Sequence, residues 1–176
     1  PYFRYSQDFD LWVKSIRKLR FANLREPLIR MREHRMKICR TMRPEQKRLS
    51  DEIRKRQLDE LEVTYTDEEL QAFHMVGSGG LAEGVSDLKH YETMLLKIFI
   101  QNKVRLIFDQ AILQRLGAGH FRHQCWAHLV RGRRIGNYYW RSQMKNYDAS
   151  FPLARKAGLA LRSVICRIYG ERWPCL

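Results

Sequence analysis

The chain of 176 residues carries 33 Lys or Arg against 19 Asp or Glu, a net charge of +14 that favours an anionic partner. Its apolar content of 44% is too high for wholesale disorder. No apolar run approaches the roughly 18 residues that a membrane-spanning helix needs. The four cysteines are widely spaced, so neither a disulfide framework nor a zinc ribbon is expected.

The positive charge is concentrated at the two ends of the chain. Residues 1–60 hold 17 Lys or Arg and 9 acids, residues 61–119 hold 5 and 8, and residues 120–176 hold 11 and 2. This asymmetry indicates two anion-facing regions joined by a segment that packs on protein. The chain begins at Pro1, which removal of an organellar targeting peptide or trimming of the chain would explain equally well.

Residues 1–76 are expected to form a basic, helical N-terminal arm. Apolar side chains recur at helical spacing within residues 8–23, and a second helix is predicted over residues 27–42. We predict secondary phosphate contacts for part of this second helix, whereas the alternative is a solvated face whose side-chain stems cover apolar neighbours. The side chains assigned this role are Arg30, Arg32 and Arg35.

The middle of the chain contains a charged helix, a capped helix and a glycine-rich segment. Residues 44–60 mix acids and bases with few apolar residues, which predicts an exposed helix that bridges to a partner. Thr66 and Glu69 have the spacing of a capping box, which predicts a short helix that stops at Gly77. Residues 77–84 contain four glycines and are expected to form a flexible hinge. A nucleotide-binding loop is the alternative, but the GK[ST] sequence and a preceding strand are missing.

The longest predicted helix covers residues 86–116 and is expected to be the core helix, ending at the glycines of residues 117–119. A last helix over residues 152–169 is expected to pack against it. No segment shows sustained period-two alternation, so the fold prediction is all-α, with about five to six helices around the core helix. The predicted divisions are the arm, the hinge over residues 77–84 and a helical body over residues 85–176.

The most specialised stretch covers residues 120–147, where cationic, aromatic and imidazole side chains interleave without any Asp or Glu. Guanidinium groups match phosphate oxygens and aromatic rings accept stacked bases, so this pattern predicts an RNA-binding surface. The alternative is a basic, solvated helix end whose aromatic residues belong to the core or to a protein interface. The side chains expected to bind RNA here are Arg122, Arg131, Arg133, Arg134, Tyr138, Tyr139, Trp140, Arg141 and Lys145.

The same stretch contains one metal-like cluster, formed by His120, His123, Cys125 and His128. Four residues spread around one continuous helix do not close a tetrahedral site, so no metal is expected. Cys125 and His128 could meet at i, i+3, but no carboxylate between residues 120 and 147 could orient the imidazole. We therefore expect neither catalytic residues nor a cofactor, and the protein is not expected to be an enzyme.

The composition resembles that of ribosomal proteins and their organelle-specific accessory relatives. This resemblance implies a structural RNA-binding subunit of a large ribonucleoprotein, a mitochondrial ribosomal protein that clamps rRNA and neighbouring proteins. The expected location is the mitochondrial matrix, with the cytoplasm as the alternative. A rival hypothesis is a non-catalytic interaction subunit or assembly factor of a mitochondrial membrane complex, whose basic face meets anionic lipid or acidic subunits.

Overall fold

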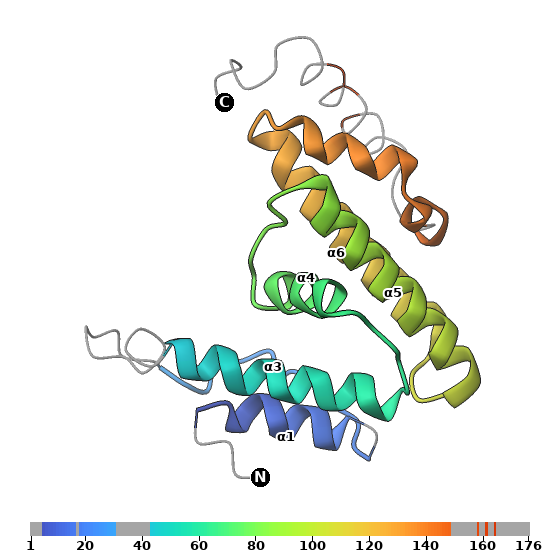
Figure 1. Ribbon diagram of the computed structural model, residues 1–176. Coiled ribbons are helices and arrows are strands. Elements are labelled where there is room, and N and C mark those ends of the chain that lie inside the picture. Colours follow the sequence, from blue (N-terminus) through green and yellow to red (C-terminus); the bar gives the residue numbers. More distant parts are fainter. Residues whose placement is uncertain are drawn as a thin grey trace. The chain divides into compact units, whose positions relative to one another are not determined.

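The computed structural model describes residues 5–16, 18–30 and 43–148, together with residues 158, 161 and 164. Within these residues the chain forms helices and connecting segments without any strand, so the all-α prediction is confirmed (Figure 1). The chain divides into two compact units, unit 1 over Pro1–Glu60 and unit 2 over Leu61–Leu176. The helices are α1 (Gln7–Ser15), α3 (Arg43–Glu60), α4 (Asp67–Gly77), α5 (Val85–Arg105) and α6 (Gln110–Val130), followed by the 3₁₀ helices η1 (Arg134–Arg141) and η2 (Gln143–Tyr147).

Unit 1 is built on the packing of α1 against α3, which lie side by side in Figure 1. Leu49 and Ile53 of α3 are buried, and Phe9 and Val13 of α1 pack on them. The sequence predicted an exposed α3 without a core of its own, and this was wrong. The two apolar residues are four positions apart and form a narrow stripe, which one short helix of the same chain suffices to cover.

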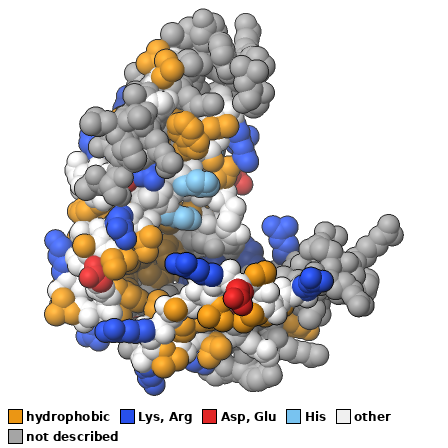
Figure 2. Space-filling view, turned by 180° about the vertical axis from the view of Figure 1, so that it is seen from behind, with side chains coloured by type: hydrophobic (Ala, Val, Ile, Leu, Met, Phe, Trp, Pro, Cys, Tyr) orange, Lys and Arg blue, Asp and Glu red, His pale blue; other side chains and the backbone are white. Residues whose placement is uncertain are grey.

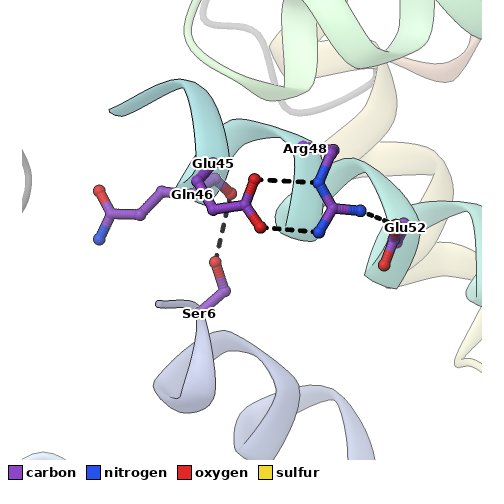
Figure 3. A network of polar contacts seen from close by, with 5 residues as sticks. All are labelled: Ser6, Glu45, Gln46, Arg48 and Glu52. Carbon is purple, nitrogen blue, oxygen red and sulfur yellow. Dashed lines mark hydrogen bonds and ion pairs between the residues drawn. The ribbon is translucent and has the colours of Figure 1, made fainter. Parts of the chain in front are cut away.

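Polar contacts reinforce the α1–α3 pair at its N-terminal end (Figure 3). The Ser6 hydroxyl donates to the Gln46 carbonyl oxygen over 3.2 Å, linking the start of α1 to α3. On α3 itself, the Arg48 guanidinium lies between two carboxylates, with 2.7 Å from Nη2 to Glu45 Oε1 and a further ion pair to Glu52. Asp10 of α1 pairs with Arg56 of α3, so charged groups also join the two helices.

The helix predicted over residues 8–23 is shorter in the structure, because α1 ends at Ser15. The helix predicted over residues 27–42 is not present over residues 27–30, and its remainder lies outside the described residues. Beyond α1, the described apolar side chains that suggested these helices are largely exposed, since Leu19 is 59% and Leu28 is 70% exposed. A short helix without tertiary packing is marginal in water, which explains why helical spacing alone did not produce these helices.

In unit 2, the capping box predicted at the start of α4 is confirmed. The Glu69 amide donates to Thr66 Oγ1 over 3.3 Å, and the Thr66 amide donates to Glu69 Oε2 over 3.0 Å. Lys97 of α5 also donates to the Glu69 carboxylate, which ties α4 to α5. Burial of Glu69 acts to raise the pKa of its carboxyl, but the hydrogen bonds from Lys97 and Thr66 outweigh this effect and hold the pKa below 4.5.

The long helix predicted over residues 86–116 is in fact a helical hairpin of α5 and α6 (Figure 1). Leu106 takes a left-handed conformation with φ of 51°, which ends α5. The buried Asn102 amide holds the turn, because Nδ2 donates to the Phe108 carbonyl oxygen and Oδ1 accepts from the Phe108 amide, each over 2.9 Å. Asp109 then caps α6 by accepting from the Ile112 amide over 2.8 Å. These are side-chain contacts that apolar periodicity does not reveal.

The glycines at residues 117 and 119 were predicted to end the helix, but α6 continues through them. A Cβ atom at Gly117 would lie 2.7 Å from Cζ of Phe99. Gly117 therefore allows α6 to approach α5 closely, which is a packing role and not a termination signal.

The glycine-rich segment over residues 77–84 lies within unit 2, between α4 and α5. The side chain of Gln124 of α6 holds it through two hydrogen bonds, since the Ala82 amide donates to Oε1 over 3.2 Å and Nε2 donates to the Gly80 carbonyl oxygen over 3.1 Å. The boundary between the two compact units lies after Glu60, before this segment. Bending at residues 77–84 stays a prediction.

The helix predicted over residues 152–169 falls mostly outside the described residues. Gly158, Leu161 and Val164 are described, and each is helical. The predicted packing of this segment on the core helix also lies outside the described residues. No described helix is both long and apolar enough to cross a membrane.

Candidate nucleic-acid interface

The segment after α6 folds back on that helix. The amides of Arg131 and Arg133 donate to the His128 carbonyl oxygen over 3.1 and 2.9 Å, and Gly132 has φ of 72° between them. A Cβ atom at Gly136 would lie 2.3 Å from the Cys125 carbonyl oxygen, so η1 sits directly on the α6 backbone. The glycines at 132 and 136 thus permit the turn and the close approach that place η1 on α6.

Most of the aromatic side chains of this stretch take part in the core of unit 2. Tyr139 is 2% exposed, and its hydroxyl donates to Asp148 Oδ2 over 2.8 Å. Tyr138 is half-buried, and its hydroxyl donates to Glu92 Oε2 over 2.6 Å. Trp140 is also half-buried and meets the Tyr139 ring edge-on, with 5.3 Å between ring centroids. Three rings expected to stack on bases are therefore placed among protein partners.

Glu92 of α5 is the first of two buried carboxylates at this site that sequence reasoning missed. It is 6% exposed and accepts hydrogen bonds from Tyr138, from the Ser142 hydroxyl over 2.8 Å and from the Gln143 amide over 2.6 Å. A signal was available, because Glu92 lies four residues after Leu88 and three before Leu95, on the buried face of the helix. An acid at such a position needs donors from another element.

Asp148 is the second buried carboxylate and directly follows the acid-free stretch. It is 1% exposed, accepts from the Tyr139 hydroxyl and forms an ion pair with Arg122 of α6. Burial, and then the hydrogen bond to Asp148, raise the pKa of Tyr139. Arg122 was expected to bind RNA, but in the structure its guanidinium joins α6 to the end of η2.

Five of the predicted RNA-binding side chains remain exposed on unit 2. We call them the 131–145 cations, and they are Arg131, Arg133, Arg134, Arg141 and Lys145. The first three follow the C-terminal end of α6, where the helix dipole favours positive charge. Lys145 also donates to the Trp140 carbonyl oxygen over 2.9 Å. Figure 2 shows that, on the face turned to the viewer, Lys and Arg side chains are scattered among apolar, uncharged and a few acidic side chains.

The remaining predicted residues belong to unit 1. Arg30 is exposed, and Arg32 and Arg35 lie outside the described residues. Of these three arginines, only Arg30 is therefore placed on a surface, and its phosphate contact stays a prediction.

The histidine and cysteine cluster is dispersed around α6. His120 Nδ1 lies 2.9 Å from the Tyr91 hydroxyl, and His123 is exposed. Cys125 and His128 are fully buried. Burial, reinforced by the nearby Glu92 carboxylate, raises the pKa of the Cys125 thiol to about 12, so the thiol stays protonated and weakly nucleophilic at neutral pH. Among the described residues, no group of three His, Cys, Asp or Glu side chains is arranged to hold a metal ion.

Comparisons with known proteins found no match to a family model, to a characterised protein or to a solved structure. Two features of the described residues bear on function. One is a set of exposed cations, and the other is a buried hydrogen-bonded frame formed by Glu92, Asp148 and their partners.

Proposed function

We propose that the protein is a non-catalytic, RNA-binding structural subunit of a large ribonucleoprotein, with a mitochondrial ribosomal particle as the expected assembly. The observation that supports the proposal is the set of 131–145 cations, which are exposed on a segment that contains no acid from residue 131 to residue 147. A surface of one sign attracts a polyanion, and guanidinium groups match phosphate oxygens in geometry.

The buried frame adds to this proposal. Glu92 and Asp148 accept buried hydrogen bonds, and Asp148 also pairs with Arg122, so the two carboxylates hold the segment in place. Cations on a fixed support lose less conformational freedom when they bind, which favours affinity. The proposed location is the mitochondrial matrix, with the cytoplasm as the alternative.

The decisive experiment measures RNA affinity at several salt concentrations for the full chain and for a variant with Arg131→Gln, Arg133→Gln and Arg134→Gln. We expect weaker binding to every RNA sequence tested and a shallower log–log salt dependence, by about 0.7 to 0.9 for each phosphate that the variant no longer neutralises. The matched control replaces Lys89, Lys103 and Arg115 with Gln, because these three cations are also exposed on unit 2 but lie on α5 and α6. Equal affinity and slope for the two triple variants would refute the proposal.

A second candidate function is an interaction subunit or assembly factor of a mitochondrial membrane complex. It is favoured by the large apolar side chains that unit 1 exposes next to basic ones, since extended apolar surface marks interaction sites. These side chains are Leu11, Trp12, Ile16, Leu19, Phe21, Leu24, Leu28 and Ile29. Sedimentation of the native particle separates the two candidates: the first requires sensitivity to RNase, and the second requires co-purification with membrane subunits that depends on detergent.

A further inference from the structure

We infer, on the basis of the proposed function, that the 131–145 cations recognise the phosphate backbone of double-helical RNA and that no base stacks on the aromatic rings between them. Double-helical RNA is thus the class of ligand for this surface. Both the placement of the rings and the spacing of the cations favour it over single-stranded RNA.

The ring faces are engaged within the protein. Tyr139 is buried on η1, and the ring of Tyr147 meets Phe99 edge-on, with 5.2 Å between centroids. Phe121 is fully buried and stacks on Tyr91, with ring centroids 6.2 Å apart. An RNA base could stack on Tyr139 or Phe121 only if the core of unit 2 opened.

Tyr138 and Trp140 are less buried, and Tyr138 is tied to the buried frame through its hydroxyl. Moving Tyr138 toward a base would break its 2.6 Å hydrogen bond to Glu92 and leave a buried carboxylate with fewer donors. Trp140 lies edge-on to Tyr139, and its carbonyl oxygen accepts from Lys145. Desolvated carboxylates that lose a donor are strongly disfavoured, so stacking on Tyr138 would be opposed by the fold.

The cations form two groups at the ends of η1. Arg131, Arg133 and Arg134 lie before or at its first residue, whereas Arg141 and Lys145 lie at or after its last. Seven residue steps in a 3₁₀ helix at about 2 Å per step separate the two groups by about 14 Å. At this separation along the backbone, the two groups can contact different phosphates of one RNA.

A rigid double helix presents phosphates at fixed separations, which suits two cationic groups held on one buried frame. Protein recognition of double-stranded RNA depends largely on shape and on phosphate and 2′-hydroxyl contacts, and needs no unstacked bases. Single strands, by contrast, gain much of their affinity from stacking, roughly 5- to 150-fold per base. The 131–145 cations provide phosphate contacts, which a duplex uses, whereas the buried rings do not provide the base stacking that a single strand uses.

The test compares binding of the full chain to a 20-base-pair RNA duplex, to a second duplex of unrelated sequence and to single-stranded oligouridine of the same strand length. We expect the two duplexes to bind equally, within about threefold, and tenfold or more tighter than oligouridine. Trp140→Ala should change duplex affinity by less than threefold, with circular dichroism to confirm that the variant is folded.

Oligouridine binding as tight as duplex binding, or a loss of fivefold or more in a folded Trp140→Ala variant, would overturn the phosphate-only inference and leave the proposed RNA-binding function standing. Duplexes that differ tenfold from each other would overturn it as well, because readout would then reach the bases. If neither RNA binds more tightly to the parent chain than to the triple arginine variant, the proposed function itself fails.

Discussion

The charged side chains of α3 and those of the segment after α6 reach their partners in different ways. On α3 many ion pairs are local, such as Lys47 with Asp51 and Lys55 with Asp59, each four residues apart. After α6 the partners are distant in sequence: Arg122 and Asp148 are 26 positions apart, and Glu92 and Tyr138 are 46 positions apart. Local charge patterns can be read from the sequence, whereas an absence of nearby acids says little about acids that the fold brings in.

The largest effect is expected for Glu92, whose hydrogen-bond partners are distant in sequence. Glu92→Ala removes the acceptor of three hydrogen bonds and should lower the free energy of unfolding by about 3 kcal/mol or more, measured by urea denaturation. Glu92→Gln should cost much less, because an amide oxygen still accepts from Ser142 and Gln143. Glu52→Ala on α3 serves as the control and should leave stability almost unchanged, because its ion pair is exposed. If Glu92→Ala and Glu52→Ala lowered the free energy of unfolding by similar amounts, buried contacts between distant residues would not be more stabilising than exposed local ion pairs.

The next effect concerns the two glycines of α6, which have the same residue type but different surroundings. Gly117→Ala should destabilise the protein by about 1 to 3 kcal/mol, because the new Cβ would lie 2.7 Å from the buried Phe99 ring. Gly119→Ala should stabilise it by about 0.5 to 1 kcal/mol, because its nearest neighbour lies 3.9 Å away, at the end of the Arg122 side chain. Urea denaturation measures both changes. A gain in stability for both variants would contradict the close packing of α6 on α5 at Gly117.

The two units should also differ in their response to acid. Burial, and then the charge of Arg133, lower the folded-state pKa of His128 below 6.5, so its neutral form stabilises unit 2 fully above pH 6.5 and this contribution is lost as pH falls through the folded pKa. One such group changes stability by at most about 1.4 kcal/mol per pH unit. Urea titrations at pH 7, 6 and 5 should show a decline that His128→Gln reduces.

Unit 1 provides the contrast for that titration. Burial of Asp10 acts to raise the pKa of its carboxyl, but Arg56 and Lys14 outweigh burial and lower it below 3.8, so the contribution of Asp10 is lost only as pH falls below that value. Asp10→Asn should therefore leave the decline between pH 7 and 5 unchanged. If Asp10→Asn reduced the decline in this range and His128→Gln did not, the decline would be due to Asp10 and not to His128.

The smallest effect is expected for Gly79, which lies in the predicted hinge over residues 77–84. Gly79 has φ of 82° and open space around its Cβ position, so Gly79→Ala should cost about 1 kcal/mol through backbone strain alone, measured by urea denaturation. Gly84→Ala, whose nearest contact lies at 3.9 Å, is the control and should change stability by less than about 0.5 kcal/mol. If residues 77–84 bend freely, Gly79→Ala will be neutral as well, because the segment can then adopt another conformation.

Much of the secondary structure follows from contacts between residues that are close in sequence. The capping box of Thr66 and Glu69, the helical character of α3 and the lack of strands in the described residues were all predicted, because they depend on neighbours three or four positions apart. The exposed position of the 131–145 cations also agrees with their charge, since isolated cations are costly to bury.

Other features depend on residues that meet only after folding. Asn102 holds the turn between α5 and α6, where one continuous helix was predicted. Gly117 allows close contact with Phe99, where a helix end was predicted. Glu92 and Asp148 make Tyr138, Tyr139 and Arg122, which were predicted to bind RNA, parts of a buried frame. The same type of side chain can pack in a core or bind a ligand. Which of the two it does depends on the donors, acceptors and rings that the fold brings within a few ångströms of it. Periodicity and composition do not contain this information, because these neighbours are distant in sequence.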